Sequence, residues 1–221
     1  MGLADLTKYR VDILVLTACA LMVLLYHWRS RVAARRHDSS LVHEVMKQAR
    51  RRWVTAIMSE RGTEVLAVQT MRNSVMAASF MASTSALLMM GMLTVGPRIE
   101  AGVDGWIAES SGSSLLDSVK ILALAIDFFI AFLMFAMSVR FFNHVGYLIN
   151  DRSLPGDEGP RRVTEWLNRA GVFYTAGVRF FFGSLPLGLW LIGPWCMFVA
   201  TIVLLLLFWK LLDHGPVPNM H

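Results

Sequence analysis

The chain has 221 residues, of which 55% are hydrophobic and 17% are charged, and its mean hydropathy is +0.51. This composition is too apolar for an ordinary soluble domain and is typical of an integral membrane protein. The formal net charge is +5, but basic residues interleaved with tryptophan fit membrane interfaces better than nucleic acid, so we expect no nucleic-acid partner. Cys19 and Cys196 lie in apolar runs without the spacing of a metal or redox motif, and we predict two buried thiols and no metal site.

Four apolar runs are candidates for membrane spans, because a bilayer core about 30 Å thick needs roughly 20 helical residues. The second run ends at Gly96-Pro97, where proline stops a helix, and the fourth contains Gly193-Pro194, which predicts a kink. Arginines rather than a small-residue cleavage site follow the first run, so we predict an anchor that is not removed. We therefore expect an all-α, single membrane domain over residues 1–221, a bundle of four transmembrane helices with cytoplasmic helical extensions. The expected spans are about 12–30, 73–96, 119–140 and 186–209.

The distribution of basic residues predicts the orientation of these spans. Ten of the 21 lysines and arginines lie between residues 28 and 72, and six lie between 139 and 179. The positive-inside rule places these two connections in the cytoplasm. We therefore expect a multi-pass protein of the cytoplasmic (inner) membrane with both termini and the 97–120 loop on the outer side.

Residues 40–62 carry apolar side chains at the i, i+3, i+4, i+7 spacing of an amphipathic helix in the first cytoplasmic connection. Two interpretations remain open, and both can hold together. The helix binds anionic phospholipid headgroups through Arg50, Arg51 and Arg52, or it packs against cytoplasmic extensions of the second and third spans. A weaker segment, about 171–185, predicts an interfacial helix or half of a re-entrant one, because a fifth crossing would leave only 195–209 for the last span.

Several blocks of the sequence resemble the domain-of-unknown-function 599 membrane family, which is found in bacteria and plants. They are "DILVL…YHW", "RRWVTAI…AVQTMRNSVMAASFMASTSALL", "SVRFFNHVGYLIN" and "AGVRFFFGSLPLGLWLIGP". The resemblance extends from Asp12 to about Trp209, and its most specific parts are AVQT-x-RNS and R-x-x-N-x-V. It implies a small multi-span membrane protein and implies no activity.

A polar line runs along the second expected span. On a helix, Gln69, Arg72, Ser79 and Ser83 fall within an arc of about 100 degrees. One interpretation is close helix packing through small residues, Ser79-xxx-Ser83 and the neighbouring Ala78-xxx-Ala82. The other is the lining of an aqueous pathway with Arg72 at its cytoplasmic mouth.

Arginines paired with amides recur at the cytoplasmic ends of the segments and predict a shared polar layer. This layer would bind phospholipid headgroups, coordinate an anion or join helix ends, and guanidinium chemistry suits all three. A simpler alternative for Arg72 is that its side chain reaches the headgroups by itself. The members of the predicted layer are Arg72, Asn73, Arg140, Asn143 and Arg179.

The third expected span carries Lys120, Asp127 and Ser138 on one face. An ionisable residue inside a bilayer is a functional candidate by default. Asp127 is open to three interpretations: it pairs with Lys120 through water, it is neutral and hydrogen-bonded to another helix, or it carries a proton or cation. His27 and His144 are candidate axial ligands of a haem, but both lie among interfacial aromatic residues, and we expect no cofactor.

Catalytic signatures such as HExxH, GxSxG, a Walker loop or GxGxxG are missing from the sequence, and we predict that the protein is not an enzyme. The preferred hypothesis is a homo-oligomeric channel or transporter-like protein for a small ion, since a chain this small encloses a path most easily by symmetric assembly. The alternatives are a non-catalytic scaffold or accessory subunit of a larger membrane complex, and a bis-histidine haem protein. Lipid headgroups are the expected contacts in every case.

Overall fold

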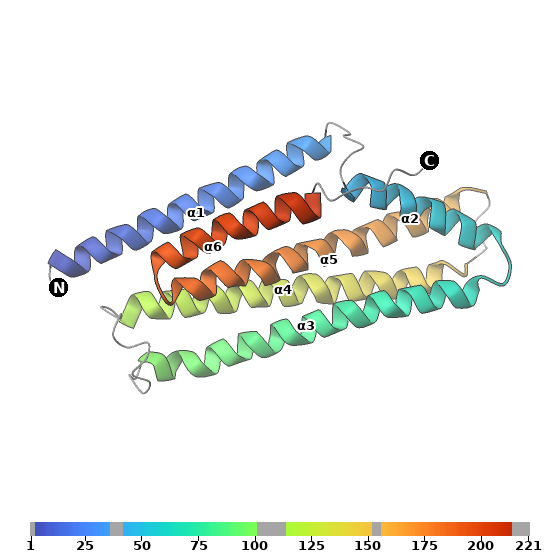
Figure 1. Ribbon diagram of the computed structural model, residues 1–221. Helices are drawn as coiled ribbons and strands as arrows, with labels where there is room; N and C mark the ends of the chain where they lie inside the picture. Colours follow the sequence, from blue (N-terminus) through green and yellow to red (C-terminus); the bar gives the residue numbers. More distant parts are fainter. Residues whose placement is uncertain (1–2, 36–41, 101–113, 152–155, 214–221) are drawn as a thin grey trace. The chain divides into compact units, whose positions relative to one another are not determined.

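The computed structural model describes residues 3–35, 42–100, 114–151 and 156–213 (Figure 1). These ranges are built from helices and contain no strand, so the predicted all-α class is confirmed. The helices are α1 (Leu3–Arg35), α2 (Val42–Ser59), α3 (Glu64–Glu100), α4 (Ser114–Leu148), α5 (Glu158–Trp190) and α6 (Pro194–Leu207), and a π-helical segment η2 (Phe208–Asp213) continues α6.

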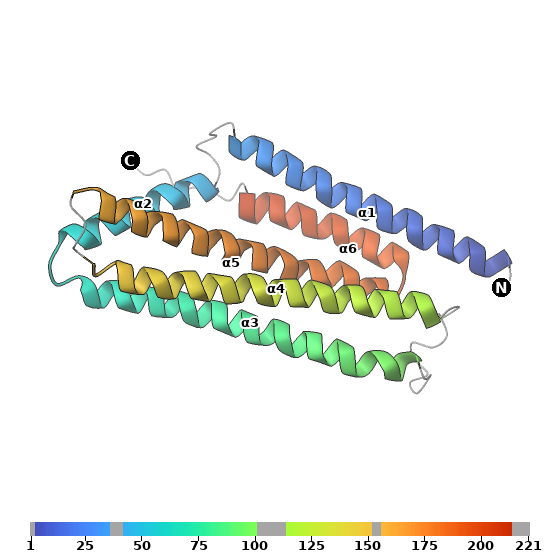
Figure 2. The same cartoon turned by 180° about the vertical axis from the view of Figure 1, so that it is seen from behind.

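Three helices of the described part are long and apolar enough to cross a membrane. They are Glu64–Thr94 within α3, Leu116–Leu148 within α4 and Glu158–Trp190, which is α5. The expected spans 73–96 and 119–140 lie inside α3 and α4, and 12–30 lies inside α1, which is 33 residues long. The long helices appear as unbroken ribbons in both views (Figure 2). Length and composition thus support a membrane protein.

The C-terminal third differs from the sequence-based prediction. The segment 171–185 is not a separate half-helix, because it lies inside α5, which runs without a break from Glu158 to Trp190 and tolerates Pro186 inside it. The expected span 186–209 is not one helix. Gly193-Pro194 separates two helices instead of kinking one, and Pro194 takes the first turn of α6, where the missing N–H costs no hydrogen bond.

The chain divides into two compact units, and α3, α4 and α5 each contribute to both. Unit 1 comprises residues 1–42, 87–128 and 181–221, and unit 2 comprises residues 43–86 and 129–180.

The core of unit 2 joins α2 to α3, α4 and α5. Fully buried Val54 and buried Ile57 of α2 belong to one cluster with apolar residues of the other three helices. The amphipathic helix predicted at 40–62 is therefore present as α2, and its packing against neighbouring helices is confirmed. Gly62, with a φ of 90°, and Thr63, whose hydroxyl donates to the carbonyl of Ile57 at 2.9 Å, turn the chain from α2 into α3.

Unit 1 has a smaller core in which α6 packs on α1, and the two helices lie side by side in both views (Figures 1 and 2). Val15 and Cys19 of α1 contribute to it together with Trp190 and Met197. Cys19 is buried as predicted, but Cys196 is exposed, which corrects the prediction of two buried thiols. An apolar run does not tell which of its faces is packed, and Cys196 lies on a face of α6 away from this core.

Candidate functional site

The face of α4 that carries Lys120, Asp127 and Ser138 is directed toward α5. In unit 1, Lys120 Nζ lies 5.6 Å from the centroid of the Trp190 ring, and Asp127 Oδ1 lies 3.8 Å from where a Cβ on Gly183 would be. In unit 2, the hydroxyl of Ser138 donates to the carbonyl of Ala170 at 2.9 Å. The shared face predicted from the sequence thus has a partner on α5 at each of its three polar positions.

A cluster of charged residues in unit 1 joins α1, α4 and the end of α5. Asp12 is 1% exposed, and its Oδ1 accepts a hydrogen bond of 3.0 Å from Nε1 of Trp190. Its Oδ2 is buried and has no hydrogen-bond partner among the described residues. Lys120, which stands over the same indole ring, forms a long ion pair of 3.5 Å with Asp117. The sequence pointed to Lys120 but not to Asp12, which looked like the hydrophilic edge of a span.

Asp127 stands inside α4, about 20 Å along the axis from the start of the helix. Its Oδ2 is buried and has no hydrogen-bond partner within the described ranges. Lys120 pairs with Asp117 instead, so the interpretation of Asp127 as its partner loses support. Opposite Asp127, Gly183 presents no side chain, and three residues later Pro186 lacks the N–H that would bond to the carbonyl of residue 182.

The three arginines of the predicted polar layer all belong to unit 2 but do not lie at one level. Gly177 packs on Phe135, so Arg179 is level with α4 residues that lie about 10 Å along the axis from Arg140. Arg72 and Arg140 are exposed, and Arg179 is half-buried and engaged with a partner. Arg72 directly follows Met71 of the unit 2 core, and Arg140 directly precedes Phe141, which packs against that core. Arg179 is thus offset along the helix axes from Arg140, and the layer of three arginines stays a prediction.

The polar line on α3 faces away from the core of unit 2. Gln69, Arg72, Asn73 and Ser83 are exposed, and Ser79 is half-buried. Of the two small-residue patterns, Ala78 and Ala82 are buried. Close helix packing therefore uses Ala78-xxx-Ala82, and Ser79-xxx-Ser83 lies on the outer side of the helix. Any path lined by Ser79 and Ser83 therefore has to be closed by another molecule.

A family model described as "Protein of unknown function, DUF599" matches residues 14–214. The chain belongs to this family. No curated protein and no solved structure matches it. The DUF599 match includes Asp127, Lys120 and Trp190, while Asp12 lies two residues before its first position.

The histidines proposed as haem ligands are only partly described in this DUF599 chain. The ring of His144 in unit 2 lies 5.2 Å from the ring of Trp166 in an edge-to-face contact, as is usual for a packed aromatic belt. The side chain of His27 lies outside the described residues. Among the side chains that are described, no group of three His, Cys, Asp or Glu is arranged to hold a metal ion.

The three consecutive arginines of α2, Arg50, Arg51 and Arg52, lie in two different environments. The guanidinium of Arg50 lies over Gly171 and donates to Oδ1 of Asn168 at 3.3 Å, and burial lowers its pKa. Arg51 and Arg52 are exposed and line a groove of about 560 Å³ on the other side of the helix. Within the triplet, Arg51 and Arg52 are the exposed arginines, and Arg51 also lies 4.0 Å from Asp157 in a surface ion pair.

Proposed function

We propose that this DUF599 protein is a homo-oligomeric, transporter-like membrane protein that moves a small cation, protons included, past Asp127. The observation that carries the proposal is the buried Oδ2 of Asp127, which lacks a hydrogen-bond partner among the described residues although it lies in a helix of membrane-spanning length. Such a carboxylate is costly in a bilayer, and intramembrane acids of this kind mark ion pathways and proton relays. Lys120 is paired with Asp117, and a carboxyl group that it does not neutralise can take up a proton or another small cation, which favours cations over anions.

The environment of Asp127 supports the same chemistry. Gly183 leaves room beside the carboxylate, and Pro186 leaves a main-chain carbonyl of α5 without its usual donor. Carboxylate oxygens and freed carbonyls of interrupted helices are the groups with which transporters coordinate small cations. Lys120 and Ser138 extend the polar face of α4 on either side of Asp127.

Assembly into a homo-oligomer is supported by the outer face of α3. Ser83 is exposed and Ser79 is half-buried within the expected span 73–96, where polar groups facing hydrocarbon are unfavourable. Gln69 and Arg72 are exposed on the same helix just before this span. Phe80 and Leu87 are exposed beside the two serines, which gives the face the mixture of apolar and polar groups found in subunit interfaces. A second copy would cover this face most simply through a two-fold axis. The same face would suit an accessory subunit, which is the rival role.

The flux of ions through reconstituted protein tests the proposed function. In proteoliposomes we expect proton or alkali-cation flux above that of empty vesicles, measured in separate H⁺, Na⁺, K⁺ and Cl⁻ gradients. Asp127→Asn keeps the shape of the side chain and removes its charge, and it should lower the flux at least tenfold. Asp157→Asn, which changes an exposed carboxylate at the start of α5, should leave the flux unchanged. Full flux in Asp127→Asn, or no flux from intact oligomer in any gradient, would overturn the proposal and favour the accessory role.

The chain path supports a cytoplasmic C-terminus in the inner membrane. If α5 crosses outward, α6 and η2 return over residues 194–213, in which the apolar helix Pro194–Lys210 is about 25 Å long and covers most of the bilayer core. The proposed return of α6 differs from the expectation that both termini lie outside, which assumed a single last span. The N-terminus remains outside and α2 remains in the cytoplasm, as expected. A green fluorescent protein fused after residue 221 should therefore fluoresce. Alkaline phosphatase fused after Gly193 should be active, and activity of the phosphatase fused after residue 221 would contradict the proposed return.

A further inference from the structure

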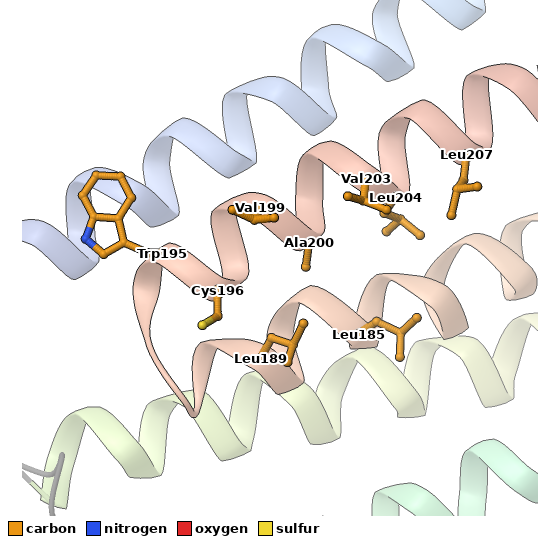
Figure 3. Close-up of a pocket in the computed structure, with 9 residues that line it drawn as sticks. All are labelled: Leu185, Leu189, Trp195, Cys196, Val199, Ala200, Val203, Leu204 and Leu207. Atoms are coloured by element: carbon orange, nitrogen blue, oxygen red, sulfur yellow. The ribbon is translucent and has the colours of Figure 1, made fainter.

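An open apolar groove separates the last turns of α5 from α6 in unit 1 (Figure 3). Its volume is about 640 Å³. The α5 wall carries Leu185 and Leu189, and the α6 wall is formed by residues between Trp195 and Leu207, with Cys196, Ala200 and Leu207 pointing toward the gap. The lining side chains are aliphatic, aromatic or thiol, and they offer a ligand no charge.

The packing of α6 on α1 keeps the groove open. Met197 and Phe208 on the opposite face of α6 pack on α1, through the core around Val15 and the contact between the rings of Tyr26 and Phe208. Closing the groove would pull α6 from that core. Both walls therefore keep large apolar side chains exposed, and Leu185 is 56% and Val203 50% exposed.

The length and lining of the groove fit a hydrocarbon chain. From Cys196 to Leu207 the α6 wall is about 16 Å long, and the residues that line the groove are apolar or carry a thiol. An acyl chain is thinner than a helix, is as apolar as the lining, and is present at every depth of the bilayer core.

A positive charge stands at one end of the groove. Lys210 follows Leu207 within one turn and is exposed, and its long side chain can reach the headgroup level while its stem covers apolar surface. We propose that the groove binds one acyl chain of an anionic phospholipid and that Lys210 holds the phosphate of the same molecule. This binding is independent of ion flux and of Asp127.

Native mass spectrometry of detergent-purified protein tests the site. After delipidation, the protein is incubated with equal amounts of phosphatidylglycerol and phosphatidylcholine that carry the same chains. We expect one tightly bound lipid per protomer, with phosphatidylglycerol preferred. Val203→Trp should fill the groove and lower lipid occupancy at least tenfold. Lys210→Ala should keep a bound lipid but lose the preference for phosphatidylglycerol.

Leu206→Trp is the matched control, because Leu206 is as exposed as Val203 on the same helix but does not line the groove. It should retain the occupancy of the wild type, and equal melting temperatures of the two tryptophan variants establish that both are folded. Alkylation of Cys196 by N-ethylmaleimide gives a second readout, which bound phosphatidylglycerol should slow while buried Cys19 stays unreactive. Equal occupancy in Val203→Trp and Leu206→Trp would overturn the proposal. Efficient cross-linking of Cys196 between two copies would also overturn it, since a second chain would then occupy the groove.

Discussion

Gly177→Leu is expected to cause a large loss of stability, because a side chain at this position collides with a fully buried ring. A Cβ on Gly177 would lie 2.8–3.0 Å from three atoms of Phe135, whose side chain is 0% exposed and belongs to the contact between α4 and α5 in unit 2. A buried ring cannot move aside as a flexible surface side chain does, and overpacking of a closed core costs about 1–3 kcal/mol or more. Thermal unfolding of the detergent-solubilised protein should show a melting temperature several degrees lower.

Gly188→Leu is the control for this effect, since a Cβ at Gly188 on the same helix meets no atom within 4 Å. It should leave the melting temperature close to that of the wild type. Shortening the ring partner provides a second check: Phe135→Ala combined with Gly177→Leu should be more stable than the sum of the two single losses predicts, as for residues in direct contact. Equal melting temperatures for Gly177→Leu and Gly188→Leu would show that α4 and α5 do not meet at this glycine.

The helical class and several helix positions follow from the sequence because they depend on local rules. Apolar runs of sufficient length predict α3 and α4, and 3.6-residue periodicity predicts α2. The α5 helix was missed because glycines, Arg179 and Pro186 dilute its hydrophobicity below that of the runs on either side. Gly171 and Gly177 are in fact positions where α5 approaches side chains of other helices closely, at Arg50 and at Phe135 respectively.

The candidate site was only partly predictable. The shared face of Lys120, Asp127 and Ser138 follows from helix periodicity alone, and the structure adds the partner that the sequence does not name, which is α5. Asp12 and Trp190 are 178 positions apart, and nothing in either local pattern indicates that they bond. The offset of Arg179 from Arg140 was not predictable for a related reason, because it depends on where α5 begins and ends.

Trp190→Phe should destabilise the protein through Asp12 rather than through lost packing. Phenylalanine keeps an aromatic ring under Lys120 but removes Nε1–H, the donor for Oδ1 of Asp12 at 3.0 Å. The other oxygen of this 1% exposed carboxylate already lacks a partner in the described part of the chain. Leaving a buried polar group unsatisfied costs about 1–3 kcal/mol, and more when the group is charged.

A double-mutant cycle separates this effect from the change in ring size. Asp12→Leu removes the carboxylate that needs the donor, so Trp190→Phe should cost clearly less stability in the Asp12→Leu background than alone, with a coupling of about 0.5–3 kcal/mol. Trp195→Phe, at an exposed tryptophan five positions further on, serves as the control and should change the melting temperature little. Strictly additive losses would mean that the two side chains do not bond. Stability losses that are smaller together than their sum would establish that the buried carboxylate of Asp12 bonds α1 to Trp190 of α5. This bond lies at the end of the α4–α5 interface, next to the pair of Lys120 and Asp117.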